Sequence, residues 1–323
     1  MALLTPLSDD EAKTIGAAYG LAVLGARPIL AGSVNSNVEL RLEGGGRAFL
    51  RIFEEQTATT AKGEARLLDH LAARGVPTPC PLRLKDDAEG FIGEHAGKPV
   101  AVFPWIEGES LCQATVTEGA ARRVGEALAR VHTAGASFEG APGSRFGPEH
   151  LAPRIEKLRS MSLPHELSRV VEDLGRKLDG FAGRRPEGPG SGLSHGDLFR
   201  DNVLWKGGEI AALLDFESAS LESWAFDLMV TLLAWCFGDG LDRALCRAMV
   251  QGYESVRPLP HGLYEEGRFA ALRFSITRIT DFELRPRGSG VFKDYRRFLA
   301  RDAALEALGP AGLTTFLGVE PSR

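Results

Sequence analysis

The chain has 323 residues, of which 44% are hydrophobic and 25% are charged, a composition typical of a globular protein large enough for two lobes. Its formal net charge of −5, without a dense Lys/Arg cluster, argues against a nucleic acid or an anionic membrane surface as the partner. There is no basic N-terminal segment before an apolar run, and no stretch reaches the roughly 20 apolar residues that span a bilayer. We therefore expect a cytoplasmic protein that binds small molecules. Composition leaves the oligomeric state open.

Near the N-terminus the pattern predicts a short helix and a β-hairpin. Ser8 and Glu11 fit a capping box, which satisfies backbone donors at a helix start, and Gly20 marks the helix end. Two apolar segments, 38–42 and 48–53, flank a glycine-rich turn, an order that is typical of a hairpin.

A second helix and a further strand follow. Apolar residues recur at helical spacing over 62–74, and a glycine and a proline end that pattern. Residues 99–103 have the composition of a strand, and the proline and glycine of 104–108 turn the chain. We therefore predict an N-terminal lobe of residues 1–103 and a C-terminal lobe of residues 104–323.

The C-terminal lobe is predicted to be mainly helical. Residues 117–132 carry apolar side chains on one helical face, and 182–192 is a surface loop rich in Gly, Pro and Arg. The exception is a second hairpin, with apolar strands at 203–205 and 210–214 on either side of a glycine turn.

The segment before this second hairpin carries the strongest chemical signal. His195, Asp197 and Asn202 follow the kinase catalytic-loop pattern H-x-D-x-x-x-x-N, and the hairpin then leads to Asp215. Such a loop can turn Asp197 toward an acceptor hydroxyl and Asn202 toward a metal, with Asp215 as a second metal ligand. The alternative, that these are ordinary turn and strand-cap residues, does not explain their kinase spacing.

On these motifs the chain resembles the aminoglycoside-phosphotransferase and choline-kinase branch of the protein-kinase-like superfamily, which uses HGDxxxxN and a later Asp. The resemblance covers nearly the whole chain. It implies a two-lobed α+β fold, in which a five-stranded antiparallel sheet forms the N-terminal, nucleotide-binding lobe. The mainly helical C-terminal lobe would then hold the catalytic and substrate residues, and ATP with Mg2+ would be the cofactors.

The resemblance also implies how the N-terminal lobe meets the phosphates. Arg51 stands where the phosphate-binding strand residue is expected, and Glu64 where the partnering helix glutamate is expected. Strand alternation supports this, because Arg51 shares a face with Phe49 and Phe53, and burying a charge there is costly without a ligand or a carboxylate. The alternative is a surface arginine. Many relatives have Lys here, so Arg retains the charge with another geometry.

Further nucleotide-binding candidates lie around these strands. The loop 31–37 would cover the phosphates with backbone and small polar groups, although it lacks GxGxxG and such a loop is also an ordinary turn. The candidates besides Arg51 and Glu64 are Gly32, Ser33, Asn35, Ser36, Asn37, Phe103 and Trp105.

Within that branch, several stretches are similar to bacterial homoserine kinases of the phosphotransferase type. They are residues 32–37, 70–79, 97–99, 195–202, 234–237 and 271–281. Val38, where an aromatic residue is expected, and the strand around Arg51 depart from that pattern. The resemblance implies phosphorylation of the side-chain hydroxyl of L-homoserine to O-phospho-L-homoserine, a step toward threonine.

The late helix supports this acceptor without the resemblance. At 3.6 residues per turn, Arg273, Thr277 and Asp281 align, with Arg278 at the edge of the stripe. Guanidinium and carboxylate groups together suit the two charged ends of homoserine, so these four are substrate-binding candidates. The alternative is a structural salt bridge with the next helix.

Two further residues are expected to support the catalytic loop. Asp227 lies on an apolar helix, where we predict a buried carboxylate that accepts hydrogen bonds from the loop, and His195 is predicted to hold the loop rather than to transfer protons. Trp235, on the same helix, is predicted to be a core residue.

Two alternative functions stay open. The first is a kinase for another small alcohol, such as an aminoglycoside, choline or methylthioribose, and the late-helix arginines argue against such cationic acceptors. The second is a catalytically inactive nucleotide-binding regulator, against which the intact set of Asp197, Asn202 and Asp215 argues.

Overall fold

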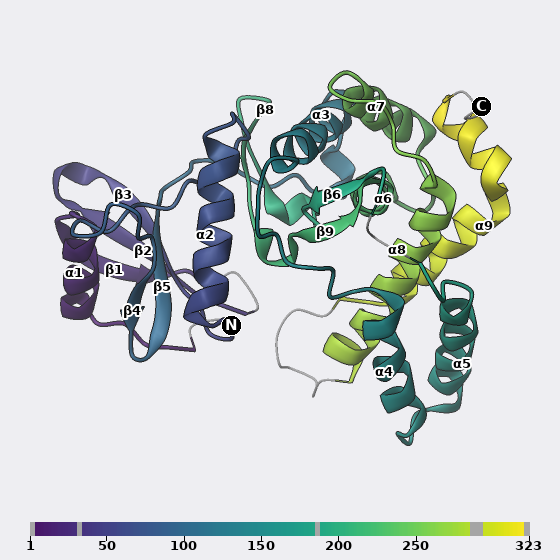
Figure 1. The fold of residues 1–323 in the computed structure, drawn as a ribbon, viewed down its shortest axis with the longest axis horizontal. Coiled ribbons are helices and arrows are strands. Elements are labelled where there is room, and N and C mark those ends of the chain that lie inside the picture. The colour runs from purple at the N-terminus through teal and green to yellow at the C-terminus, as the bar shows by residue number, and fades with distance from the viewer. Residues whose placement is uncertain (1–3, 31–33, 185–187, 285–292, 320–323) are drawn as a thin grey trace. The chain divides into compact units, whose positions relative to one another are not determined.

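The computed structural model describes residues 4–30, 34–184, 188–284 and 293–319 (Figure 1). The chain divides into two compact units, which we call the N-terminal unit (Met1–Gly108 with Ala211–Glu217) and the C-terminal unit (Glu109–Ile210 with Ser218–Arg323). This grouping differs from the predicted division after residue 103 in the placement of residues 104–108 and 211–217.

A five-stranded antiparallel sheet forms the centre of the N-terminal unit, with the strand order β1-β2-β3-β5-β4. The predicted hairpin is present, and its turn is a 3-10 segment at Glu43–Gly45. Alternate side chains of β2 and β3 are buried, which is the pattern of a sheet with one face on a core. The strands are β1 (Val23–Pro28), β2 (Ser36–Leu42), β3 (Arg47–Ile52), β4 (Gly93–His95) and β5 (Lys98–Pro104).

Two helices complete the N-terminal unit. Helix α1 (Asp9–Ala18) begins at the predicted capping box, where Ser8 and Glu11 satisfy each other's backbone amides. It packs on β1 and supplies Ala12 and Ile15 to the core of the sheet. Helix α2 (Ala58–Ala72) packs on β5.

Helices dominate the C-terminal unit, which confirms the predicted α+β organisation with an antiparallel sheet in one part and helices in the other. The apolar helix α6 is buried from Ala225 to Trp235 and packs on α8. The helices are α3 (Glu118–Gly135), α4 (Pro148–Arg159), α5 (His165–Asp179), α6 (Trp224–Trp235), α7 (Arg243–Glu254), α8 (Leu263–Arg278) and α9 (Arg296–Leu317).

Two glycines let α3 and α7 approach closely. A Cβ atom on Gly125 of α3 would lie 2.0 Å from Met249 O, and one on Gly252 of α7 would lie 1.9 Å from Arg122 O. No side chain fits at such distances, so this helix contact depends on both glycines. The contact brings the C-terminal end of α7 against α3, which matters for the site described below.

Two short two-stranded sheets flank the predicted catalytic loop. Strand β6 (Ser191–Ser194) leads into the loop and pairs antiparallel with β9 (Ser220–Ser223). Strand β7 (Val203–Lys206) leaves the loop and forms the predicted second hairpin with β8 (Glu209–Leu213). The loop is therefore held at both of its ends.

The late helix differs from the prediction at its C-terminal end. Helix α8 ends at Arg278, and Ile279–Glu283 continue as a π-helix. A π-helix has more residues per turn than an α-helix, so Asp281 leaves the stripe that we predicted from 3.6 residues per turn.

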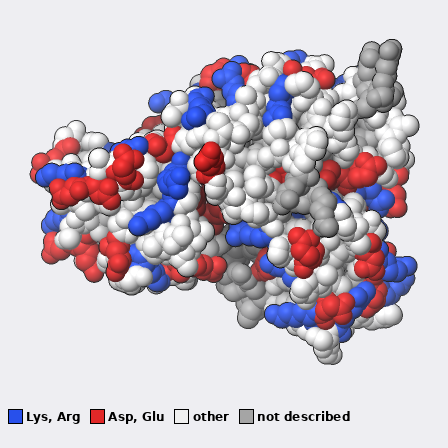
Figure 2. Space-filling view, viewed as in Figure 1, with Lys and Arg blue, Asp and Glu red and all other residues white. Residues whose placement is uncertain are grey.

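Acidic and basic side chains are interspersed over the face of the molecule shown in Figure 2. Among the residues that the structure describes, no helix combines the length and the apolar character needed to cross a membrane. The charge pattern of the surface is thus mixed rather than dominated by one sign.

Candidate active site

The predicted catalytic loop is a compact turn in the C-terminal unit. The amide of Phe199 donates to Asp197 O (2.7 Å), and the amide of Asn202 donates to Phe199 O (3.0 Å). The Asn202 side-chain nitrogen also donates to Asp197 O, at 2.8 Å. The side-chain nitrogen of Asn202 thus helps to close the loop.

The glycine of the His195–Asp197 segment is required by the backbone. Gly196 has φ +75°, in the left-handed region, and a Cβ atom on it would lie 2.8 Å from Ser218 O. Any other residue would strain the turn and push the neighbouring chain away. Next to it the buried His195 accepts a hydrogen bond from the Asp197 amide at Nδ1 (3.3 Å).

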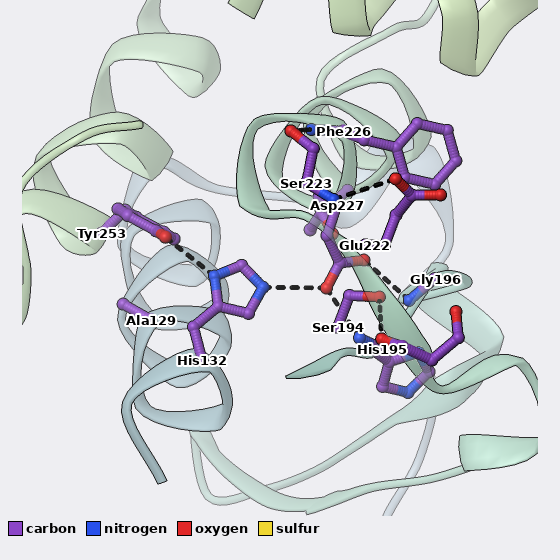
Figure 3. Close-up of polar contacts among 12 residues, drawn as sticks. Ala129, His132, Ser194, His195, Gly196, Glu222, Ser223, Phe226, Asp227 and Tyr253 are labelled. Atoms are coloured by element: carbon purple, nitrogen blue, oxygen red, sulfur yellow. Dashed lines mark hydrogen bonds and ion pairs between the residues drawn. The ribbon is translucent and has the colours of Figure 1, made fainter. Parts of the chain in front are cut away.

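Asp227 of α6 fixes the start of the loop (Figure 3). Its buried carboxylate accepts hydrogen bonds from the amides of His195 and Gly196, both at 2.7 Å, and contacts His132 Nε2 at 2.9 Å. Burial opposes the charge, but the hydrogen bonds from His132 and the loop outweigh burial and hold the pKa of Asp227 below its usual value. An ionised carboxylate therefore anchors the loop.

Behind Asp227 lies a buried relay that sequence reasoning missed (Figure 3). His132 of α3 contacts Asp227 through Nε2 and the Tyr253 hydroxyl of α7 through Nδ1, at 2.8 Å. Burial lowers the pKa of His132 although Asp227 opposes the shift. The neutral ring donates to Asp227 and accepts from Tyr253, so each group has a matching partner. No local motif marks these residues, which are distant in sequence.

Helix α6 holds the loop at two further points. Trp235 Nε1 donates to Leu198 O at 3.0 Å, and the Arg200 guanidinium donates to Ala234 O. The predicted core position of Trp235 is confirmed, since it is fully buried. Its hydrogen bond to the loop was not predicted.

Arg273 of α8 faces the Asp197 carboxylate. Arg273 Nη1 lies 3.8 Å from Asp197 Oδ1, and its guanidinium is stacked between the rings of Phe146 (3.8 Å) and Phe274 (3.7 Å). Burial lowers the pKa of Arg273 to about 10, against the attraction of Asp197. The side chain remains a cation at neutral pH.

Arg278, at the end of α8, is a second cation in this part of the unit. It donates to Asp294 O at 3.0 Å, and its guanidinium lies 4.4 Å from the centre of the Phe298 ring. Burial lowers its pKa to about 10, and Asp197 again opposes the shift. Two guanidinium groups therefore act electrostatically on the Asp197 carboxylate.

The other two residues of the predicted stripe have local partners. The Thr277 hydroxyl donates to Arg273 O at 3.0 Å, one turn back in the helix. Asp281, displaced by the π-helix, pairs with Arg154 of α4 at 2.7 Å and accepts from the Thr280 hydroxyl at 2.8 Å. The structure thus separates Asp281 from Arg273. The salt bridge that we held as the alternative runs to α4 rather than to the next helix.

In the N-terminal unit, Arg51 lies between two glutamates. Its Nη1 is 3.7 Å from Glu64 Oε1 and 3.8 Å from Glu217 Oε1, and Asn37 is its partner in the β2–β3 register. The Asn35 side-chain amide donates to Glu217. Burial and the Asp215 carboxylate raise the pKa of Glu217 to about 7. Sequence reasoning missed Glu217, although it stands only two residues after Asp215.

Asp215 has an unusual backbone. Its φ of +63° lies in the left-handed region, which is uncommon for residues other than glycine. Just before it, the Leu213 amide donates to Pro77 O and the Thr78 hydroxyl donates to Leu213 O (3.0 Å), so the segment is tied to the rest of the N-terminal unit. Strain that the surrounding structure maintains is frequent at functional positions.

The remaining candidates for nucleotide binding differ in their burial and their contacts. Phe103 is buried on β5 with its ring 6.1 Å from that of Phe49, and Trp105 lies under the Arg47 guanidinium at 4.4 Å. Ser36 is fully buried, and its hydroxyl donates to Glu54.

The phosphate-covering loop is described only in part. Asn35 Oδ1 accepts from the Glu54 amide at 3.2 Å, and the Ser36 hydroxyl accepts from the amides of Leu4 (2.8 Å) and Thr5 (3.1 Å). Ser36 is therefore engaged in holding the N-terminal segment. Gly32 and Ser33 lie outside the described residues.

Comparison with known proteins gives consistent results. A family model described as "Phosphotransferase enzyme family" matches residues 25–259. A homoserine kinase from Methylocella silvestris is 32% identical over 322 residues, covering 96% of this chain and 98% of that protein. One from Beijerinckia indica is 32% identical over 320 residues, covering 96% and 97%. An amicoumacin kinase, solved in complex with AMP-PNP and Ca2+, has a TM-score of 0.68 at 16% identity, covering 92% of this chain and 94% of that one, a likeness of fold.

Proposed function

The chain belongs to the phosphotransferase enzyme family, and from this premise we propose that it is a kinase that uses ATP to phosphorylate the side-chain hydroxyl of L-homoserine, giving O-phospho-L-homoserine. The observation that carries the acceptor is the pair of arginines, Arg273 and Arg278, acting on Asp197. Two guanidinium groups favour an acceptor with a carboxylate, whereas they would repel cationic acceptors such as choline or an aminoglycoside. The names of the relatives support the same acceptor.

In the proposed reaction Asp197 orients the acceptor hydroxyl and takes its proton. The hydroxyl oxygen then attacks the γ-phosphorus of ATP, the bond to the β-phosphate oxygen breaks, and ADP leaves. The loop that carries Asp197 is held by the hydrogen bonds of Asp227 to His195 and Gly196. This anchoring positions the base before substrate arrives, so little reorganisation is needed during transfer.

On the nucleotide side we assign the phosphates to Arg51, which Glu64 orients from a distance of 3.7 Å. Asn37 stands opposite Arg51 in the sheet register and is a further candidate for phosphate contact. Phe103 and Trp105, which follow one another closely at the end of β5, would line the base of the nucleotide.

We assign magnesium to Asn202 and Asp215. An amide oxygen and a carboxylate are hard oxygen ligands of the kind that Mg2+ takes, alongside nucleotide phosphates and water. The fit rests on these donors: the Asn202 nitrogen is used by the loop, which leaves its oxygen for another partner. When bound, the ion would offset the negative charge of the phosphates during transfer.

For the acceptor carboxylate the contacts favour Arg278 over Arg273. Arg278 is half-buried, whereas Arg273 is 3% exposed and stacked between two phenylalanine rings. Asp281 retains 39% side-chain exposure beside Arg154 and is the candidate for the ammonium group of homoserine. Thr277 is 7% exposed and bonded to the helix backbone, so we expect it to shape the site rather than to bind.

An acceptor panel tests this function. The purified chain with ATP and Mg2+ should release ADP with homoserine at least about a hundredfold faster than with serine, choline, methylthioribose or kanamycin, because only homoserine matches both the charges and the length of the acceptor. Equal or greater turnover with one of the other acceptors would contradict the assignment. ATP binding without turnover of any acceptor would favour the inactive regulator.

A further inference from the structure

Arg273 is a buried cation, and two of its three guanidinium nitrogens have no hydrogen bond to any residue that the structure describes. The residue is 3% exposed, and its Nε and Nη1 atoms have no hydrogen-bond partner within the described part of the chain. A buried cation without such partners is costly. Burying Arg273 therefore lowers the stability of the fold, and a functional gain is needed to explain why a cation is placed there.

The counter-ion of Arg273 is Asp197. Asp197 Oδ1 lies 3.8 Å from Nη1 of Arg273. The attraction of this carboxylate opposes the lowering of the Arg273 pKa by burial and so favours the charged guanidinium. The other charged neighbours, Arg145, Arg154 and Arg278, are cations that repel it. The electrostatic setting of Arg273 is thus directed at the proposed base.

The stacking of Arg273 also limits what it can bind. The rings of Phe146 and Phe274 lie 3.8 and 3.7 Å from the guanidinium carbon, so both faces of the planar group are covered. Its Nε and Nη1 atoms are closed off from solvent. A substrate carboxylate would have to displace an aromatic ring or Asp197 itself to reach these atoms.

We infer that Arg273 is a positioning residue for Asp197, holding the carboxylate of the base by charge from a fixed point on α8, and that it does not bind the substrate carboxylate. The inference rests on the proposed function, since Asp197 must be the base. It divides the late-helix arginines between two tasks, with Arg273 acting on the base and Arg278 on the acceptor. The buried cation is then a cost in stability that serves catalysis.

Kinetics of Arg273→Met and Arg273→Lys test this division. Arg273→Met should lower kcat about 10- to 100-fold, a loss typical of removing one electrostatic contact near the reacting atoms. The KM for homoserine should change less than about threefold, because the acceptor contact is intact. Arg273→Lys should recover part of kcat, since a cation remains.

A double-mutant cycle makes the test sharper. In an Asp197→Asn background, Arg273→Met should cost less than about twofold in kcat, because the carboxylate on which it acts is gone. A loss as large as in the parent background would overturn the inference. So would an Arg273→Met variant in which the KM for homoserine rises tenfold or more and kcat is unchanged.

Stability separates this role from a structural one. Replacing the buried cation by Met should leave the Tm unchanged or raise it, because Met packs well between aromatic rings and needs no counter-charge. Arg268→Met is the matched control on the same helix. Arg268 pairs with Asp302 at 2.8 Å, so this variant should lose stability while keeping kcat and both KM values.

The outcomes distinguish this inference from the proposed function. If the parent turns over homoserine but Arg273→Met and Asp197→Asn lower kcat independently, so that the double variant shows the product of the two losses, the inference alone fails. If the parent turns over no homoserine, both fail. A large fall in Tm for Arg273→Met and Arg273→Lys alike would make Arg273 a structural residue and would also overturn the inference.

Discussion

At the scale of single residues, chemistry converges on one aspartate whose surroundings come from several elements. Asp197 sits on a turn closed by Asn202, and Arg273 faces it from α8. Asp227 anchors the start of the loop and so fixes the backbone that carries the proposed base.

Asp197→Asn should therefore be a clean test of the base. The amide has nearly the same shape, and the hydrogen bonds that close the loop use the backbone of Asp197, so the loop conformation and the ATP affinity should stay close to those of the parent, although Arg273 loses its counter-ion and the Tm should fall. Turnover should fall by about two to four orders of magnitude, the usual share of general-base catalysis. Steady-state kinetics beside an ATP titration would check this, and equal activity would remove Asp197 from the mechanism.

Asp215 invites a test through its proposed metal. Asp215→Ala should abolish measurable turnover at every magnesium concentration, because a water molecule cannot replace a carboxylate at that position. Activity should be followed from micromolar to millimolar magnesium in parent and variant. Full recovery at high magnesium, or a nucleotide affinity that does not depend on the metal in the parent, would contradict the assignment.

At the scale of elements, the notable feature is how α3, α6 and α7 hold the catalytic loop. The close approach of α3 and α7 at Gly125 and Gly252 puts Tyr253 within 2.8 Å of His132, which in turn meets Asp227. The relay thus transmits helix packing to the amides of the loop. Its function needs a neutral imidazole, which makes stability depend on pH.

The pH dependence follows from the lowered pKa of His132. In the unfolded chain a histidine takes up a proton near pH 6.5, whereas the buried ring resists it. Below that pH the unfolded state binds more protons than the native state, so the free energy of unfolding falls as the pH drops from about 7 to 5. Tm values across this range should show the fall.

Two variants test whether His132 causes this fall of Tm with falling pH. His132→Gln should be less stable than the parent at pH 7, because hydrogen bonds of the relay are lost, but should show a shallower fall of Tm between pH 7 and 5. The exposed His150 gives the control, and His150→Gln should keep the slope of the parent. A His132→Gln protein with the full slope would show that another group is responsible.

The elements also show which parts of the site were open to prediction. Patterns contained in a few consecutive residues, such as the Ser8 capping box and the His195–Asn202 motif, predicted their local structure because the interactions are local. The relay joins residues 95 and 121 positions apart in sequence, which no spacing rule reports. The predicted position of Asp281 was wrong because an α-helical period was assumed beyond Arg278, where the chain forms a π-helix.

At the scale of the whole molecule, the fold is shared with kinases that act on different acceptors, so the fold alone does not specify the substrate. The antiparallel sheet and the helical unit could be predicted because hydrophobic period and glycine turns are strong signals. The proposed acceptor site lies on α8, where the sequence indicated the two arginines but not the different surroundings of each. Arg273 and Arg278 differ in burial, which only the packing of the helices determines.

The central claim is that the acceptor is an amino acid recognised by its carboxylate through Arg278. Homoserine amide keeps the reacting hydroxyl and the ammonium but lacks the negative charge, so it isolates this contact. Loss of a charge partner in a desolvated site typically costs about 2 to 5 kcal/mol, which is about 30-fold or more in kcat/KM.

The most direct measurement is the ratio of kcat/KM for homoserine to that for homoserine amide, in the parent and in Arg278→Ala, with ATP saturating. We predict a ratio above about 30 in the parent and a ratio below about 3 in Arg278→Ala, because this variant lacks the contact that favours homoserine over its amide. The KM for ATP should be the same in both proteins. A parent that uses homoserine and its amide equally well would contradict carboxylate recognition and, with it, the proposed acceptor.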